Sequence, residues 1–274
     1  MSGKLYCVGT PIGNLEDLSP RAQRILNSVD FIAAEDTRVT LKLLNHFGIK
    51  KELLSYYEHN KKEKGAYLIS RMLKGENMAL VTDAGMPAIS DPGEDIVREA
   101  HKNGIEVIAV PGPVAFATAL CVSGMPSGRF CFEGFLSVNK PSRKKHLEEI
   151  KDEKRTLIFY EAPHKLVSTL SDLLGVLGNR EISVVKELTK IHESVFNTDL
   201  EKALRYFTEN PPKGEYVLII KGKEEEEEKT FTLDDAVKIA KKYISEGSGI
   251  SAASKSAAQI TGIKKSDIYR EICS

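Results

Sequence analysis

Carboxylates and an arginine stand at the ends of predicted strands, where they could bind a ligand or accept a proton. The segment AEDTR carries Glu35, Asp36 and Arg38, and Asp83 ends the strand pattern MALVTD. The carboxyl ends of parallel strands meet at one edge of a sheet, and ligands bind there in open α/β folds. We therefore expect these side chains to face one crevice. A contact between Asp36 and Arg38 within the turn is the alternative for that pair.

The loop that begins at Asp83 lacks the side chains that usually bind phosphate. Residues 83–93, DAGMPAISDPG, contain no lysine, arginine or histidine, and Pro87 and Pro92 stiffen them. A pocket built from this loop would recognise its ligand with backbone groups and one carboxylate. This composition favours a neutral or cationic small molecule over a polyphosphate.

The turn GTPIG at residues 9–13 has two interpretations. It follows a strand pattern, as the glycine turn of a dinucleotide site does, and Glu35 or Asp36 could then contact a ribose. In that motif the helix begins at the turn, whereas here the capping pair Ser19 and Pro20 predicts a later start. We favour a turn whose glycines let the backbone pass close to a ligand or a partner loop.

Further polar residues follow strand patterns in the second half of the chain. Glu161 lies in FYEAPH and Glu187 in KELTK, and each could be functional or could cap the following turn. His164 and His192 could line a pocket. The six histidines and four cysteines show no metal-ligand spacing and no CxxC pair, so we expect neither a metal site nor a disulfide framework.

An α/β scaffold has to position these residues. Strand patterns alternate with helical patterns in residues 1–127, which predicts an N-terminal α/β domain with a largely parallel sheet. The alternation resumes in residues 128–223, which predicts a second α/β domain. The acidic run at 224–228 is typical of a solvated linker, and residues 230–274 are typical of a small helical appendage that resembles a helix-turn-helix.

The overall charge favours neither nucleic acid nor membrane as a partner. The 39 basic residues balance the 39 acidic ones, so any RNA contact must come from local basic clusters. One cluster, NKPSRKKH at 139–146, is predicted to be a loop, with Arg143, Lys144 and Lys145 as candidate RNA contacts or simply solvated charges. No apolar run is long enough for a membrane helix, and we expect a cytoplasmic protein without membrane contact.

Segments in order along nearly the whole chain resemble the tetrapyrrole methylase family. They are VGTPIGNLEDLSPRA, AEDTR, DAGMPAISDPG, PGPVA, GFL with KPSRKKH, FYEAPH, KELTK and KGEYVLII. AEDTR and FYEAPH are similar to the branch that methylates the 2′-oxygen of a cytidine in the decoding region of 16S ribosomal RNA. The resemblance implies two α/β domains of the class III methyltransferase type, a cleft for S-adenosylmethionine between them, a homodimer, and 16S rRNA in the small ribosomal subunit as substrate.

The resemblance also implies a set of cofactor contacts from both halves of the chain. The cofactor is a sulfonium cation without phosphate, which agrees with the composition of the 83–93 loop. The chain departs from the family pattern at Met86, where a small polar residue is expected. The implied contacts are Pro11, Asp83, Gly85, Met86, Ser90, Val114, Ala115, Tyr160, Leu188, Pro212 and Gly214.

Methylation of a ribose hydroxyl requires alignment of the reacting atoms and removal of the hydroxyl proton. Asp36, Glu35 and Glu187 are the candidate bases, in that order. Arg38 and Lys186 are candidates to orient a phosphate or stabilise the developing oxyanion. Three other functions are compatible with parts of the sequence: a methylase of a tetrapyrrole or other small molecule, a dinucleotide-dependent oxidoreductase, and a nonenzymatic RNA-binding protein.

Overall fold

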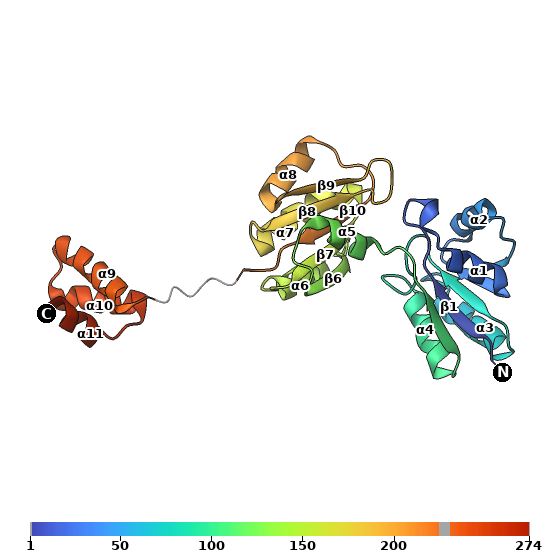
Figure 1. Cartoon of the computed structure of the whole chain (residues 1–274), viewed down its shortest axis with the longest axis horizontal. Helices are drawn as coiled ribbons and strands as arrows, with labels where there is room; N and C mark the ends of the chain where they lie inside the picture. The colour runs from blue at the N-terminus through green and yellow to red at the C-terminus, as the bar shows by residue number, and fades with distance from the viewer. Residues whose placement is uncertain (1, 225–230, 274) are drawn as a thin grey trace. The chain divides into compact units, whose positions relative to one another are not determined.

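The structure, a computed structural model, describes residues 2–224 and 231–273 (Figure 1). The chain divides into two units, Met1–Lys223 and Glu224–Ser274. The acidic run predicted as a linker lies outside the described residues except for Glu224.

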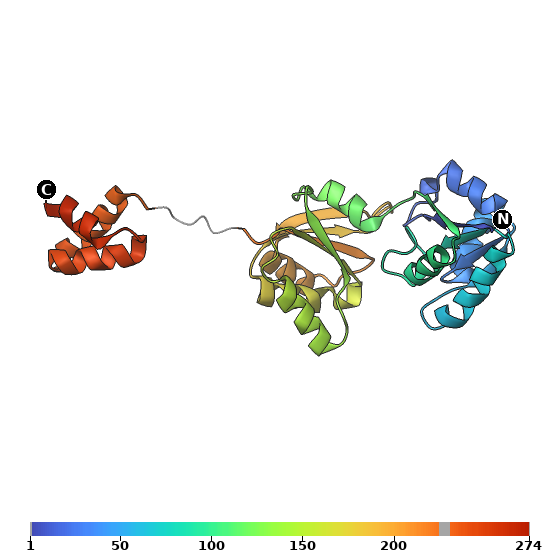
Figure 2. The same ribbon diagram turned by 90° about the horizontal axis from the view of Figure 1, so that it is seen from below.

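The first sheet contains five parallel strands in the order β3-β2-β4-β1-β5. Helices α1 and α2 cover one face, and α3 and α4 cover the other (Figure 2). The two-sided cover explains why β2 and β4 are apolar throughout rather than alternating. The elements are β1 (Lys4–Val8), α1 (Pro20–Ser28), β2 (Phe31–Ala34), α2 (Thr37–His46), β3 (Glu52–Ser55), α3 (Lys61–Leu73), β4 (Met78–Val81), α4 (Gly93–Lys102) and β5 (Glu106–Val110).

The predicted parallel sheet is confirmed, and so is the late start of the first helix. Ser19 accepts a hydrogen bond from the Ala22 N–H, and Pro20 occupies the first turn of α1. A short 3-10 turn, Leu15–Asp17, separates β1 from this helix. Strand β3 and helix α3 were not predicted. The strand is short and only half-buried, and the helix begins within the polar, lysine-rich segment 57–64.

The second sheet is mixed, with strand order β6-β7-β10-β8-β9. Only β6 and β7 are parallel, and the other neighbours are antiparallel. Strand β9 was not predicted, because four of its six residues are polar and it lies at the sheet edge. The elements are α5 (Ala115–Ser123), β6 (Phe130–Phe135), α6 (Lys140–Ile150), β7 (Thr156–Glu161), α7 (Leu166–Leu177), β8 (Glu181–Lys186), β9 (Ser194–Asp199), α8 (Leu200–Glu209) and β10 (Tyr216–Ile220).

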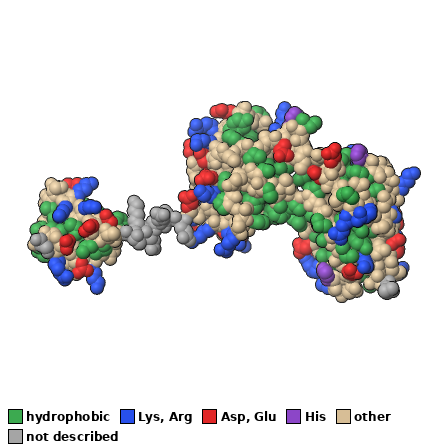
Figure 3. Space-filling view, viewed as in Figure 1, with side chains coloured by type: hydrophobic (Ala, Val, Ile, Leu, Met, Phe, Trp, Pro, Cys, Tyr) green, Lys and Arg blue, Asp and Glu red, His purple; other side chains and the backbone are tan. Residues whose placement is uncertain are grey.

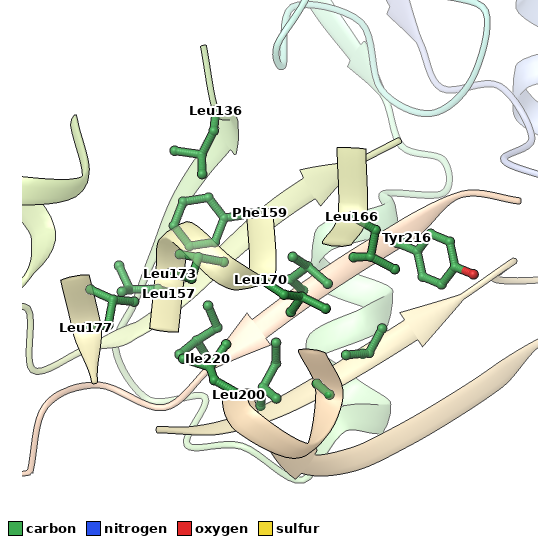
Figure 4. Close-up of a cluster of buried hydrophobic side chains, with 14 of the residues drawn as sticks. Leu136, Leu157, Phe159, Leu166, Leu170, Leu173, Leu177, Leu200, Tyr216 and Ile220 are labelled. Carbon is green, nitrogen blue, oxygen red and sulfur yellow. The ribbon is translucent and has the colours of Figure 1, made fainter. Parts of the chain in front are cut away.

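Two unequal layers cover the second sheet. Helices α6, α7 and α8 bury an extensive leucine-rich core against one face, as Figure 4 shows for Leu166, Leu170 and Leu173 of α7. The other face meets the single helix α5, through Ala119 and Leu120.

The prediction of a basic loop at 139–146 is wrong, because these residues begin helix α6. Asn139 caps this helix by accepting a hydrogen bond from the Ser142 N–H at 3.1 Å, and Pro141 lies in the first turn. Asn and Pro suggest a turn when they are interpreted singly, but in this order they also start a helix. The basic residues therefore lie on a helix that packs against the second sheet.

The unit Glu224–Ser274 contains three helices, α9 (Leu233–Ser245), α10 (Ile250–Thr261) and α11 (Lys265–Cys273). Thr232 and Asp235 form a reciprocal capping box at the start of α9. Gly262, with a φ of +72°, ends α10. Within the described ranges, no helix combines the length and apolar character needed to cross a bilayer.

Candidate functional site

A cleft of about 640 Å³ lies at the carboxyl ends of β2, β4 and β7 within the unit Met1–Lys223. Both sheets contribute to its walls. The N-terminal half supplies Ile12, Glu35, Thr82, Asp83, Ala84, Gly85, Met86, Ile89, Ser90 and Asp91. The remaining wall is formed by Val114, Ala115, Phe135, Tyr160, Glu161, Ala162, Pro163, His164, Val185, Glu187, Leu188, Glu215, Tyr216 and Val217.

The walls are apolar and acidic. The lining includes six carboxylates and one histidine, and among the described residues that form it none is a lysine or an arginine. Burial raises the pKa of Asp83 and of Asp91 above the ordinary value for an aspartate. The cleft therefore suits a ligand that carries positive charge and apolar surface, and it is unsuited to a polyphosphate.

Eight of the eleven residues predicted to contact the cofactor line this cleft: Asp83, Gly85, Met86, Ser90, Val114, Ala115, Tyr160 and Leu188. Pro11, Pro212 and Gly214 are not part of the lining. Gly214 has a φ of +87°, and a Cβ there would lie 2.6 Å from side-chain atoms of Glu187. Its role in this structure is to make room for that glutamate.

The loop after Asp83 is held by the carboxylate of Asp91. The Asp91 carboxylate accepts hydrogen bonds from the backbone N–H groups of Ala88, Ile89 and Gly93 at 3.0, 3.3 and 2.7 Å. Ala88 has a φ of 66°, a conformation that these bonds hold in place. An aspartate two residues before a helix start is a recognisable signal for such a turn.

The GTPIG turn and the 83–93 loop are joined by backbone contacts. Thr10 and Gly85 exchange N–H···O bonds of 2.9 and 3.1 Å. A Cβ on Gly9 would lie 2.7 Å from the Met86 sulfur and 2.7 Å from the Gly112 Cα. The favoured interpretation of GTPIG as a close-approach turn agrees with this packing, and the Met86 thioether packs beside the Gly9 backbone.

Glu35 is held at the cleft by a neighbouring strand end. Its Oε2 accepts a hydrogen bond from the Thr82 hydroxyl at 2.6 Å. Because β2 and β4 are adjacent parallel strands, residues that follow them emerge side by side. No ion pair is formed by Glu35 within the described residues.

Asp36, the first-ranked candidate base, does not line the cleft. Its carboxylate caps helix α2 through the Arg38 N–H at 2.8 Å and also accepts from Arg38 Nε at 3.0 Å and Nη2 at 2.6 Å. These bonds from Arg38 lower the pKa of Asp36 to about 2. The turn contact considered as an alternative is thus present. It occupies the carboxylate of Asp36 and makes that side chain a poor candidate for the base.

Glu187 lines the cleft but is ion-paired. Its Oε1 accepts from Lys190 Nζ at 2.9 Å and from the Glu215 N–H at 2.9 Å. The Lys190 bond lowers the pKa of Glu187. With a φ of 51°, Glu187 occupies a conformation that is unusual for a residue with a Cβ. Lys186 does not line the cleft.

Arg143, predicted to contact RNA, is a largely buried link between helices. Its side chain is 12% exposed and donates to Asp172 Oδ2 at 2.6 Å and Thr169 Oγ1 at 2.8 Å. The Thr169 hydroxyl in turn donates to Glu161, a buried carboxylate of the cleft wall. Lys144 and Lys145 are exposed on the same helix.

His164 lines the cleft, and His192 does not.

Comparison with family models gives one match that spans most of the chain. Residues 4–204 match the model described as Tetrapyrrole (Corrin/Porphyrin) Methylases. The chain belongs to the tetrapyrrole methylase family. Several relatives are 41–50% identical to this chain. A protein of Halalkalibacterium halodurans, "Ribosomal RNA small subunit methyltransferase I", is 50% identical over 97% of this chain and 93% of its own length.

Other members of the tetrapyrrole methylase family with that same name are also similar. The one from Thermotoga maritima is 46% identical over 81% of this chain and 100% of its own length. The one from Escherichia coli O157:H7 is 43% identical over 98% of this chain and 94% of its own length. High coverage on both sides means that the similarity includes both α/β halves.

Solved structures of the tetrapyrrole methylase fold are more distant in sequence. A diphthine synthase superposes with a TM-score of 0.61 at 16% identity, covering 81% of this chain and 90% of the other. The Thermus thermophilus uroporphyrin-III C-methyltransferase, solved with S-adenosyl homocysteine, superposes with a TM-score of 0.56 at 20% identity. The match covers 80% of this chain and 97% of the other. At these identities the likeness concerns the fold.

Proposed function

We propose that the protein is an S-adenosylmethionine-dependent methyltransferase that methylates the 2′-oxygen of a cytidine ribose in 16S ribosomal RNA of the small subunit. The observation that carries this proposal is the cleft, whose described lining has six carboxylates and no lysine or arginine. Relatives at 41–50% identity over nearly the whole chain, which are named ribosomal RNA small subunit methyltransferase I, support the substrate class.

The residues of the cleft fit this cofactor. S-adenosylmethionine supplies a methyl carbon on a positively charged sulfur, which departs without taking up a proton. Asp83 and Glu35 offer negative charge, whereas Ile12, Leu188 and Val217 offer apolar surface. Backbone groups of the 83–93 loop are kept available because Asp91 fixes the turn. The volume of the cleft is within the range of small-molecule sites.

Glu35 is the best-placed candidate for the base that removes the ribose proton. Asp36 and Glu187 each bind a cation, and each has a lowered pKa, so they hold a proton less readily. Glu35 faces the cleft with one hydroxyl donor, from Thr82. We assign it the role of accepting the 2′-hydroxyl proton as the oxygen forms its bond to the methyl carbon.

We also propose a homodimer that acts in the cytoplasm, where ribosomal RNA is modified. Helix α5 supports the dimer, because Val122 on it is 44% exposed and Phe130 beside it is 40% exposed. Hydrophobic side chains gather on this part of the surface (Figure 3). A helix that is apolar around its whole circumference usually has partners on both sides. The proposed division into domains 1–127, 128–223 and 230–274 is supported by the two separate sheets and the helical unit, but helix α5 packs on the second sheet, which moves the first boundary to before Ala115.

Calorimetry tests the cofactor assignment directly. The purified full chain should bind S-adenosylmethionine and S-adenosylhomocysteine, and it should show no heat of binding with NADH or ATP, whose phosphates meet an acidic wall. Binding of NADH in place of S-adenosylmethionine would contradict the proposal.

A further inference from the structure

We propose that the exposed face of helix α2 binds the RNA backbone next to the nucleotide that enters the cleft, and that Asp36 acts as a positioning residue for Arg38 on this face. The inference rests on the proposed function and adds to it a substrate-binding surface. We call the exposed side chains of Arg38, Lys42 and His46 the α2 basic stripe.

The start of α2 is fixed to the edge of the cleft. Glu35 lines the cleft, and the next residue, Asp36, is the N-cap of the helix. The Asp36 N–H donates to Asp83 Oδ1 at 3.0 Å, so a second cleft residue holds the same turn. A strand of RNA whose ribose reaches Glu35 must therefore pass the first turn of α2.

The charge pattern of α2 differs from that of helix α4 in the same domain. Arg38, Lys42 and His46 follow one another at intervals of four residues, which places them on one face at steps of about 6 Å along the helix axis. The helix Thr37–His46 contains no acidic residue. Within the described residues, Lys42 and His46 have no acidic partner at ion-pair distance. The Lys42 ammonium is therefore available to phosphates, and Arg38, although it is paired with Asp36, can still donate from Nη1.

Helix α4, on the opposite face of the same sheet, is the contrasting case. Arg98 pairs with Glu94 and with Asp95, the latter at 2.9 Å, and Lys102 pairs with Glu99 at 2.7 Å. Its cations are neutralised within the helix. Arg98 and Lys102 thus provide a matched control for Arg38 and Lys42 in the same domain.

Arg38 is both exposed and fixed. Its side chain is 86% exposed, yet Nε and Nη2 are hydrogen-bonded to the Asp36 carboxylate at 3.0 and 2.6 Å. The Nη1 group has no partner within the described residues. An exposed arginine that is already held in one orientation loses less conformational freedom when it contacts a phosphate. This arrangement gives Asp36 a function that does not require it to accept a proton.

The first experiment measures methyl transfer to small ribosomal subunits prepared from cells that lack this enzyme. The double variant Arg38→Ala with Lys42→Ala should raise KM for the subunits on the order of tenfold, with the dissociation constant for S-adenosylmethionine unchanged within about twofold. The slope of log KM against log salt should fall by about 1.4, since each single-strand phosphate contact contributes about 0.7. Arg98→Ala with Lys102→Ala should leave both quantities unchanged.

The second experiment separates a positioning role from a basic role for Asp36. Asp36→Ser keeps an N-cap for α2 but cannot hold the guanidinium. It should raise KM as Arg38→Ala does, and the double variant Asp36→Ser with Arg38→Ala should be no worse than Arg38→Ala alone. The kcat at saturating subunits and its pH profile should remain those of the wild type.

Two results would overturn the inference. An unchanged salt slope in Arg38→Ala with Lys42→Ala would show that RNA does not contact the stripe. A collapse of kcat in Asp36→Ser, with KM unchanged, would make Asp36 a catalytic residue. If the wild type itself transfers no methyl group to the subunits, the proposed function fails instead, and the two failures are therefore distinguishable.

Discussion

Glu35 accepts a 2.6 Å hydrogen bond from the hydroxyl of Thr82, which joins the ends of the neighbouring strands β2 and β4 at the floor of the cleft. This bond orients a carboxylate that has no cationic partner among the described residues. The two other candidate bases are each bound to a cation, Asp36 to Arg38 and Glu187 to Lys190. The difference in partners is the reason to assign the base to Glu35.

Replacement of the proposed base should separate catalysis from binding. Glu35→Gln keeps the size of the side chain and can still accept from Thr82, but it cannot take up a proton. Methyl transfer should fall by about 10²–10⁴-fold, the usual contribution of a general base. The dissociation constant for S-adenosylmethionine should change by only a few fold. Glu94→Gln, on the exposed surface of α4, is the control, and turnover of Glu35→Gln at the wild-type rate would remove Glu35 from the mechanism.

The affinity for a cationic cofactor should depend on the ionisation of Asp83. Burial raises the pKa of this carboxyl, so it takes up a proton at a higher pH than an ordinary aspartate. Protonation removes a negative charge from the wall, and the affinity for S-adenosylmethionine should therefore weaken as the pH falls through the raised pKa. Asp83→Asn should bind more weakly at neutral pH and show a flatter pH dependence. Calorimetry across this range measures both effects, and identical curves for the two proteins would contradict the role of Asp83.

The close packing at Gly9 predicts a loss of stability that a matched glycine should not show. A Cβ on Gly9 would meet the Gly112 backbone at 2.7 Å, so Gly9→Ala should lower the free energy of unfolding by roughly 1–3 kcal/mol. A Cβ on Gly175, inside helix α7, would meet no atom within 4 Å. Gly175→Ala should raise the stability by about 0.5–1 kcal/mol. Urea denaturation followed by circular dichroism tests both, and a neutral Gly9→Ala would show that the turn can relax.

Arg143 and its neighbour Lys144 should respond differently to the same substitution. Arg143→Ala removes hydrogen bonds to Thr169 and Asp172 and should destabilise the protein by roughly 1.5–3 kcal/mol. Lys144→Ala should stay within about 0.5 kcal/mol of the wild type. Thermal unfolding measures the melting temperatures of the two variants, and Arg143→Ala should have the lower one. Equal melting temperatures for the two variants would mean that the buried arginine does not hold α6 to α7.

Local patterns predicted four of the five strands of the first sheet, all except β3, and the position of the cleft. Short apolar runs such as MALV and FIAA, bounded by polar turns, favour buried strands, and parallel strands bring the residues after them to one edge. For this reason the sequence alone predicts that Glu35 and Asp83 share one site. The composition of the 83–93 loop similarly predicted a wall that lacks phosphate-binding side chains.

Side-chain partners across the fold were not predictable in the same way. Asn139 and Pro141 can start either a turn or a helix, and the lysines around them do not decide between the two, so the sequence predicts a loop at 139–146 where α6 begins. The burial of Arg143 depends on Thr169 and Asp172, which are 26 and 29 residues away. The ranking of the candidate bases depends on whether the Asp36 carboxylate faces the cleft or binds Arg38, and the sequence does not distinguish these two arrangements. These outcomes depend on tertiary distances that no local pattern contains.

The most direct test of the central claim is methyl transfer from labelled S-adenosylmethionine to small ribosomal subunits from cells that lack the enzyme, followed by mapping of the label. We predict label on the 2′-oxygen of a single cytidine in the decoding region of 16S rRNA. Label on a base, or no label in RNA while a tetrapyrrole or another small molecule is methylated, would contradict the account.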